Sequence, residues 1–160
     1  MTGQVLTTPR SGPPSAGRTA HLERPRPVSV VSSVKSDSHT WNLIYLELVL
    51  RELGHHVVNL GPCVPDEMLA DECVHLRPDL VVLSSVNGHG LRDGAGAAAA
   101  IRRRRELTKV PIVIGGRLTV SGELRPADVA GLRRAGVDAV LDEVDALRAF
   151  AGTLSTWTTP

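Results

Sequence analysis

A carboxylate and an imidazole stand two residues apart in the segment Ser36-Asp37-Ser38-His39-Thr40, directly after a run rich in β-branched residues. A carboxylate that accepts the proton of one imidazole nitrogen fixes the tautomer and makes the other nitrogen a more basic metal ligand. Because an Asp-x-His pair is common in proteins, its meaning depends on what the fold places beside it. His39 is therefore a candidate metal ligand, and Asp37 is the candidate group that orients it.

Two later segments also follow apolar runs and also contain unusual residue types. One is the hydroxyl pair Ser84-Ser85, and the other is the double glycine Gly115-Gly116. Buried hydroxyl groups need hydrogen-bond partners, and paired glycines remove side chains where another group must approach the backbone closely. Together with Asp37 and His39, these segments predict a deep cleft that has a metal ligand at its mouth.

Apolar periodicity and turn residues predict strands that alternate regularly with helices. Strands are expected at residues 28–34, 56–60, 80–85, 110–114 and 139–141, and helices at residues 40–53, 65–76, 91–107, 126–135 and 143–152. This alternation is typical of an α/β fold with a doubly wound parallel sheet between two layers of helices. Five strands fit the flavodoxin-like (Rossmann-like) order 2-1-3-4-5, in which ligands bind beyond the carboxyl ends of the first and third strands. That topology brings Asp37, His39, Ser84 and Gly115-Gly116 to one edge of the sheet.

The 160 residues are sufficient for one domain of this kind, but not for an additional large substrate-binding barrel. Residues 1–26 are rich in Pro, Gly, Ser, Thr and Arg, have almost no apolar periodicity, and are expected to form a disordered leader. The folded domain is expected at residues 27–152, followed by a frayed tail at residues 153–160.

The composition argues against nucleic acid and membrane as partners. The net charge is +1, and the densest basic run, Arg102-Arg103-Arg104-Arg105, is expected on the outer face of a helix. No apolar run is long enough to span a membrane, and the N-terminus lacks the apolar core of a signal peptide. Cys63 and Cys73 have no C-x-x-C spacing and suit a reducing compartment, and both are expected to be at least partly buried. We therefore expect a soluble cytoplasmic protein.

Taken together, Asp37-x-His39, Ser84-x-Val86 and Gly115-Gly116 resemble the D-x-H-x-x-G…S-x-L…G-G signature of the cobalamin-binding domain. The resemblance runs from about residue 28 to residue 136 and is strongest to the small subunits of glutamate mutase (methylaspartate mutase). Asn42 stands where the signature has glycine, Val86 stands where it has leucine, and Asn87 stands where the mutase subunits usually have an aromatic residue.

The resemblance implies that adenosylcobalamin binds base-off, with His39 as the axial ligand of cobalt and Asp37 bonded to the other imidazole nitrogen. Ser84 would meet the buried nucleotide base, and the double glycine would let the nucleotide tail pass. It assigns no catalytic residue to this chain. The cofactor-binding residues that it implies are Ser36, Asp37, Ser38, His39, Thr40, Ser84, Ser85, Val86, Gly88, Gly115, Gly116, Arg117, Leu118, Thr119, Val120 and Ser121.

By the same resemblance, the chain is the cobalamin-binding subunit of a carbon-skeleton mutase, an isomerase that converts glutamate to 3-methylaspartate by radical rearrangement. The radical chemistry belongs to the cofactor. The substrate would sit in a larger barrel-type subunit, so a hetero-oligomer is expected.

Three other functions compete with this interpretation. A corrinoid carrier for methyl transfer, or a light or vitamin sensor, would keep the cofactor, but such proteins commonly place a helical bundle before the cobalamin domain. A flavodoxin-like electron carrier would need aromatic residues after the third and fourth strands to sandwich a flavin, and they are missing there. A response-regulator receiver would need a phosphorylatable Asp at the end of the third strand, where this chain has serines.

Overall fold

The computed structural model describes residues 25–141 and 144–157, so nearly all of the predicted leader and the last three residues lie outside the described residues. The strands are β1 (Val28–Ser33), β2 (His56–Gly61), β3 (Leu80–Ser85), β4 (Ile112–Gly116) and β5 (Ala139–Leu141). The helices are α1 (Trp41–Glu52), α2 (Asp66–Leu76), α3 (Gly90–Arg102), α4 (Pro126–Ala135) and α5 (Val144–Trp157), with a short 3-10 turn at Arg105–Leu107.

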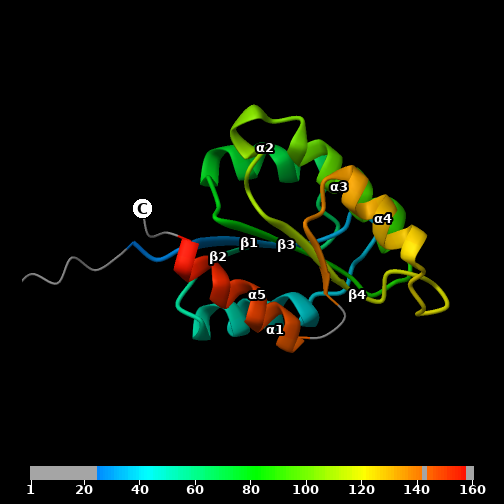
Figure 1. Ribbon diagram of the computed structural model, residues 1–160, viewed down its shortest axis with the longest axis horizontal. Helices are drawn as coiled ribbons and strands as arrows, with labels where there is room; N and C mark the ends of the chain where they lie inside the picture. The colour runs from blue at the N-terminus through cyan, green and yellow to red at the C-terminus, as the bar shows by residue number, and fades with distance from the viewer. Residues whose placement is uncertain (1–24, 142–143, 158–160) are drawn as a thin grey trace, which may run out of the picture.

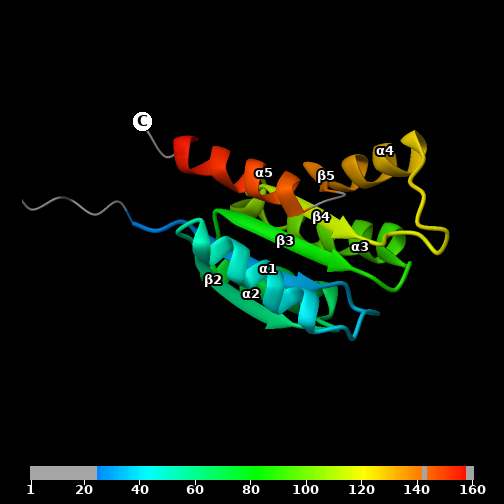
Figure 2. The ribbon, with the colours of Figure 1, turned by 90° about the horizontal axis from the view of Figure 1, so that it is seen from below.

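The strands form one parallel sheet in the order β2-β1-β3-β4-β5, which confirms the predicted fold class and topology. Helices α2, α3 and α4 cover one face of the sheet, and α1 and α5 cover the other (Figure 1). Each of the four connections between consecutive strands contains a helix, as the sequence pattern requires. The carboxyl ends of β2, β3 and β4 lie at the same edge of the molecule (Figure 2).

The central strand β3 is buried on both faces, as its continuous apolar run predicts. Its side chains alternate between two cores. Val81 and Leu83 pack with the helices α2, α3 and α4, whereas Leu80 and Val82 pack with α1 and α5. Two separate cores thus hold the central strand, and the end of β3 is fixed in position by both.

The helix expected at residues 91–107 is wrong in its last five residues, because α3 ends at Arg102 and a separate 3-10 turn follows. The guanidinium of Arg102 turns inward and donates to the carbonyl oxygens of Leu107, Val110 and Gly136. These bonds hold the chain in a turn that a continuous helix would not allow. Arg102 is therefore not on a solvated helix face, whereas Arg103 and Arg105 are exposed.

Three further differences concern the ends of elements and the cysteines. Strand β4 begins at Ile112 rather than at residue 110, and α5 continues to Trp157 rather than ending at residue 152. Cys73 is buried as expected, but Cys63 is exposed, because it follows β2 in a left-handed conformation with φ of 55°. Within residues 25–141 and 144–157, no helix is both long enough and apolar enough to cross a membrane.

Candidate functional site

The ends of β1, β3 and β4 are adjacent at one edge of the sheet, as predicted. Ser33 pairs with Ser84 between β1 and β3, and Ser84 pairs with Gly115 between β3 and β4. The loop that carries Asp37 follows β1 directly. The three segments that the sequence singled out therefore meet in space.

The carboxylate of Asp37 joins two of these segments. It is fully buried and accepts three hydrogen bonds, from the backbone N–H of His39 at 3.0 Å, from Nδ1 of His39 at 2.6 Å and from the backbone N–H of Val86 at 2.5 Å. Burial alone raises the pKa of Asp37, but these hydrogen bonds outweigh it and hold that pKa below its ordinary value. Asp37 therefore stays ionised and ties the loop after β1 to the end of β3.

The imidazole of His39 is held through one nitrogen only. An ionised carboxylate can only accept hydrogen bonds, so Nδ1 of His39 donates to Asp37 and Nε2 of the neutral ring keeps its lone pair. The side chain is 50% exposed. His39 therefore offers one basic nitrogen to a ligand at the mouth of the site.

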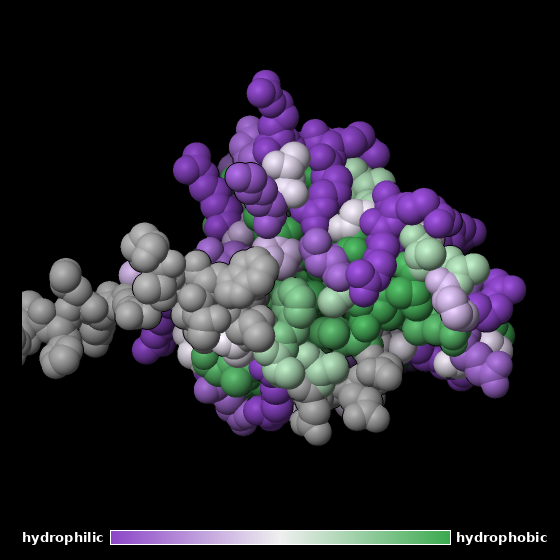
Figure 3. Space-filling view, in the orientation of Figure 1, coloured by the Kyte–Doolittle hydropathy of each residue, from purple (hydrophilic) through white to green (hydrophobic). Residues whose placement is uncertain are grey.

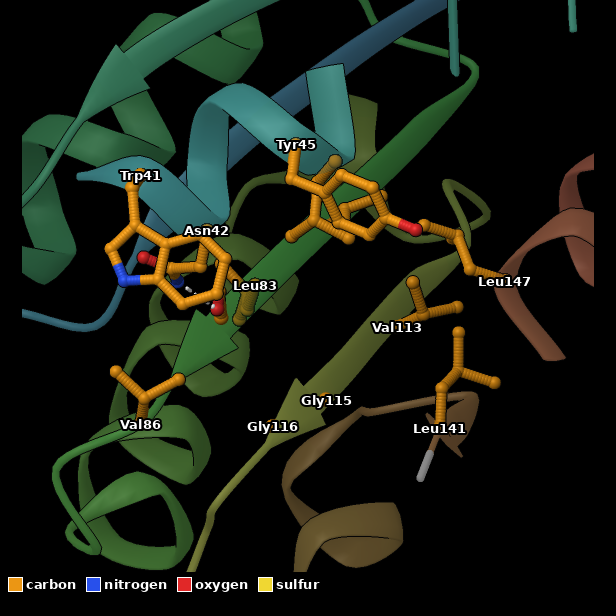
Figure 4. A pocket seen from close by; sticks show the side chains of 13 residues that line it. Trp41, Asn42, Tyr45, Leu83, Val86, Val113, Gly115, Gly116, Leu141 and Leu147 are labelled. Atoms are coloured by element: carbon orange, nitrogen blue, oxygen red, sulfur yellow. Dashed lines mark hydrogen bonds between the residues drawn. The ribbon is translucent and has the colours of Figure 1, made fainter. Parts of the chain in front are cut away.

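A cavity of about 310 Å³ opens beside this pair, between α1 and α5 on one side and β3, β4 and β5 on the other (Figure 4). Its walls are almost entirely apolar. The residues that line it are Trp41, Asn42, Tyr45, Leu46, Val82, Leu83, Ser84, Val86, Val113, Gly115, Gly116, Leu141 and Leu147. Deep, mostly apolar cavities with a few polar groups are typical of cofactor sites.

The double glycine is needed where β4 passes its neighbours. A Cβ atom on Gly115 would lie 2.7 Å from the carbonyl oxygen of Leu141. A Cβ atom on Gly116 would collide with the carbonyl oxygen of Ser85, and Gly116 has φ of 101°, a conformation that side chains rarely adopt. The two glycines thus let the strand close against its neighbours and leave one wall of the cavity without side chains.

The polar end of the cavity is a pair of side chains from α1 and β3. Nδ2 of Asn42 donates to Oγ of Ser84 at 2.5 Å, and both residues are buried (Figure 4). Oδ1 of Asn42 is buried as well and has no hydrogen-bond partner among the described residues. Such an atom is costly unless a bound group satisfies it.

Several predicted residues lie near the site but outside this cavity. Ser85 is fully buried and its Oγ donates to Oδ1 of Asn87 at 3.2 Å. Asn87 in turn donates to the backbone carbonyl of Ser36 at 2.9 Å, which gives a second link between the two loops. Ser38 and Thr40 are exposed on the loop before α1. Their expected contacts with a cofactor stay predictions.

The loop after β4 turns away from the cavity. Leu118 is buried in the core on the α3 side, where its Cδ2 would lie 2.6 Å from a Cβ atom on Gly90. Gly88, Thr119 and Val120 line a separate, smaller hollow of about 230 Å³. Arg117 donates to the carbonyl of Val120, and Ser121 is exposed within the same loop. Among the described residues, those at positions 117–121 line this second hollow or lie outside both.

Most residues of the cavity wall were not identified as site residues from the sequence. Trp41 and Tyr45 come from α1, Leu141 from β5 and Leu147 from α5. A signal was present, because α1 is apolar on nearly every side and leaves large side chains exposed, with Trp41 at 69%. A helix that is apolar on nearly every side can pack against the sheet and also line an apolar cavity. Figure 3 shows apolar side chains across this face of the molecule, between α4 above and α5 below.

The residues fit a corrinoid cofactor. Among the described residues, no three ligating side chains gather at one point, so the single nitrogen of His39 suits a metal that brings its other ligands with it. The glycine wall and the unpartnered amide oxygen of Asn42 suit an organic group that enters the apolar cavity.

Comparison with known proteins gives an independent result. The family model of the B12 binding domain matches residues 27–151. The glutamate mutase sigma subunit of Halobacterium salinarum is 32% identical over 99 residues, which are 59% of this chain and 62% of that protein. The HTH-type transcriptional repressor CarA of Myxococcus xanthus is 30% identical over 90 residues, which are 56% of this chain and 31% of the repressor. The chain thus spans less than two thirds of either relative.

Solved structures agree on the fold. A cobalamin-binding protein from Desulfitobacterium hafniense superposes with a TM-score of 0.67 at 20% identity, over 81% of this chain and 60% of that one. The signal receiver domain of the putative response regulator NarL from Mycobacterium tuberculosis superposes with a TM-score of 0.56 at 22% identity, over 82% of this chain and 95% of that one. Similarity at this level concerns the arrangement of strands and helices alone.

Proposed function

Because the chain belongs to the B12-binding domain family, we propose that it binds cobalamin with His39 as the axial ligand of cobalt. The nucleotide tail of the cofactor would enter the cavity between α1 and α5. The observation that carries this proposal is the position of the His39–Asp37 pair beside an apolar cavity with a glycine wall.

The residues at the site have distinct physical roles in this proposal. Asp37 keeps the proton on Nδ1 of His39, so Nε2 presents its lone pair to the metal. The N–H of Val86 fixes the position of Asp37 and therefore of the imidazole. The apolar walls exclude water from the buried tail, and Ser84 supplies a hydroxyl group at its polar end.

The chain would act as the small subunit of an adenosylcobalamin-dependent mutase that converts glutamate to 3-methylaspartate. When bound, adenosylcobalamin supplies a cobalt–carbon bond that breaks homolytically and starts radical chemistry. Support comes from the identity with the glutamate mutase sigma subunit. The half-exposed His39 lies at an open mouth, which suits a larger barrel-type subunit that covers the cofactor and holds the substrate.

A second candidate function keeps the cofactor and changes the role. The similarity to the repressor CarA is nearly as high as the similarity to the mutase subunit. A carrier or regulatory domain would bind the cofactor through the same residues, but without a barrel partner that converts glutamate.

The first experiment tests cofactor binding. The chain is titrated with adenosylcobalamin in the dark and the visible spectrum is recorded, with His39→Ala beside His75→Ala. His75 is an exposed histidine on α2, bonded to the carbonyl of Asp71, and serves as a matched control. We expect the spectrum of a nitrogen-ligated cofactor in the wild type and in His75→Ala, and either a base-off spectrum or no binding in His39→Ala.

A second readout does not depend on the metal spectrum. Trp41 lines the cavity, and the only other tryptophan is Trp157, so quenching of fluorescence by cobalamin that disappears in Trp41→Phe reports a ligand near α1. An unchanged spectrum together with unchanged fluorescence contradicts the binding proposal.

The mutase role is tested separately. The loaded chain is mixed with the large subunit of a glutamate mutase and supplied with glutamate, and 3-methylaspartate is measured. Formation of product supports the mutase. Tight cofactor binding without product would favour the carrier or regulatory role.

A further inference from the structure

Asn42 is a departure from the family signature that changes the polar end of the cavity. The signature has glycine at this position, whereas here an amide reaches from α1 to Ser84 on β3 (Figure 4). The side chain is only 9% exposed, and it lines the cavity together with Ser84. Among the described cavity residues, Trp41 and Val86 flank this end, whereas Tyr45 and Leu147 lie at the other.

The hydrogen bonds of this pair are incomplete. Oγ of Ser84 accepts a hydrogen bond from Nδ2 of Asn42. The hydroxyl proton of Ser84 has no acceptor among the described residues. Oδ1 of Asn42 has no donor there either. The pair therefore offers one donor and one acceptor to a group in the cavity.

The same count holds if the amide is turned by half a rotation about its last bond, a torsion that is broad for asparagine. The hydroxyl of Ser84 then donates to Oδ1, which leaves a lone pair on Oγ and the N–H groups of Asn42. In either state, at least one donor and one acceptor stay unsatisfied. With glycine at position 42, only Ser84 of this pair could hydrogen-bond a ligand in the cavity.

We propose that Asn42 and Ser84 select the base at the end of the nucleotide tail, and that the preferred base is an aminopurine such as adenine rather than an alkylbenzimidazole. This inference rests on the proposed binding of a corrinoid in this cavity. An aminopurine carries a ring nitrogen beside an exocyclic amino group, so it supplies both an acceptor and a donor. A dimethylbenzimidazole supplies only the acceptor and leaves one member of the pair unsatisfied.

The cost of that unsatisfied atom sets the size of the effect. A buried polar group left without a partner costs about 1–3 kcal/mol, which corresponds to about 5-fold to 150-fold in affinity. A site that hydrogen-bonds a donor group of its ligand strongly rejects an analogue without that donor. An apolar pocket discriminates less strongly between ligands that differ only in shape. We expect a preference of at least about tenfold for the aminopurine form.

The test compares three corrinoids on the whole chain by spectral titration. They are a cobamide with adenine as the lower base, cobalamin with its dimethylbenzimidazole, and cobinamide, which has no nucleotide. The cost of displacing each cofactor's own base from cobalt is the same in every variant, so the change in the ratio of the two cobamide affinities between the wild type and a variant isolates the cavity.

Two variants separate hydrogen bonding from shape. Asn42→Gly removes the amide and enlarges the cavity, whereas Asn42→Leu keeps nearly the same volume without polar atoms. In both variants the preference for the aminopurine cobamide over cobalamin is expected to be smaller than in the wild type. Asn59→Ala is the control, because both amide atoms of Asn59 are paired, with Glu47 and with the N–H of Gly61, outside the cavity. It should keep the preference, and circular dichroism checks that each variant folds.

Each outcome has a definite meaning. Equal affinities for the two cobamides, or a preference of the same size in the wild type and in Asn42→Leu, overturn the selection by Asn42 while leaving corrinoid binding intact. Cobinamide binding with no gain from either nucleotide overturns the assignment of the cavity. No binding of any of the three corrinoids overturns both this inference and the proposed function.

Discussion

The two edges of the sheet each hold a histidine whose Nδ1 lies 2.6 Å from an oxygen atom, and the surroundings give them opposite roles. At the amino edge, Nδ1 of His55 meets the hydroxyl of Ser29, and the side chain also bonds to the backbone of Ala151 in α5. At the carboxyl edge, His39 meets the ionised Asp37 and is half exposed. Distance alone does not distinguish a structural histidine from a ligand. The charge of the partner and the freedom of the second nitrogen do.

The same contrast applies to glycines. Gly54 beside His55 and Gly116 beside the cavity both have positive φ, of 88° and 101°. A Cβ atom on Gly54 would meet nothing within 4 Å, whereas one on Gly116 would collide with Ser85. At the amino edge glycine serves only the turn. At the carboxyl edge it also keeps space beside the cavity.

Replacing each of the two histidines by alanine, in separate variants, gives the largest expected effects on cobalamin binding and on stability. His39→Ala should weaken cobalamin binding more than about 100-fold, because even the outer partner of a metal-bound histidine is worth about 10–100-fold. It should lower the free energy of unfolding only modestly, because Asp37 loses one hydrogen bond and keeps the two from backbone N–H groups. His55→Ala should do the reverse, with a loss of about 1–3 kcal/mol of stability from buried groups left unpaired. Spectral titration and urea unfolding of both variants measure the two quantities, and equal effects on binding would remove the distinction between the edges.

Asp37→Asn is expected to weaken cobalamin binding by about 10–100-fold, because the amide no longer fixes the tautomer of His39. The amide also places N–H groups near the donors that now bond to Asp37, so the midpoint of urea unfolding should fall too. Asp79→Asn is the matched control at the amino edge, where Asp79 accepts from the N–H of Val28. Normal affinity in Asp37→Asn would show that His39 does not depend on this carboxylate.

Gly116→Ala is expected to cost about 1–3 kcal/mol of stability and to reduce cobalamin affinity, since the methyl group meets Ser85 and intrudes on the cavity wall. Gly54→Ala shares the backbone strain but not the collision. It should cost less stability and leave affinity as it is. The comparison is made by urea unfolding and spectral titration, and it fails if both substitutions change affinity equally.

The smallest effect concerns pH. Burial holds the pKa of His55 below its ordinary value, against the opposing influence of the Ala151 backbone and Asp79. Below about pH 6.5 the unfolded chain binds a proton that the folded chain resists, so stability should fall as pH is lowered from about 7 to 5. Asp37, whose pKa is lowered, contributes in a separate window, below about pH 4. Urea midpoints across pH 5–7 should slope less in His55→Phe, and an identical slope would assign the dependence to other groups.

Much of the carboxyl edge of the sheet could be predicted from the sequence, because its residues follow directly after recognisable strands. The alternation of apolar runs and turns predicts the sheet order, and a parallel sheet necessarily gathers the residues that follow its strands. Asp37, His39, Ser84 and Gly115-Gly116 meet for that reason.

The cavity wall could not be predicted in the same way. Trp41, Tyr45 and Leu147 are apolar, and apolar residues line a cavity or fill a core with the same sequence pattern. The path of the loop after β4 could not be predicted either, because it depends on Leu118, which packs in the α3 core close to Gly90. Asn42 stood out only as a departure from a signature, and its hydrogen bond to Ser84 depends on the packing of α1 against β3.

The central claim is that a nitrogen of this protein, that of His39, takes the axial position on cobalt. The most direct test is the electron paramagnetic resonance spectrum of the reduced cobalt(II) cofactor bound to the chain, with the protein uniformly labelled with nitrogen-15 and the cofactor unlabelled. If Nε2 of His39 binds cobalt, each cobalt hyperfine line splits into three with unlabelled protein and into two with labelled protein. A splitting into three that persists in the labelled protein would place the cofactor's own base on cobalt and rule out His39 as the axial ligand.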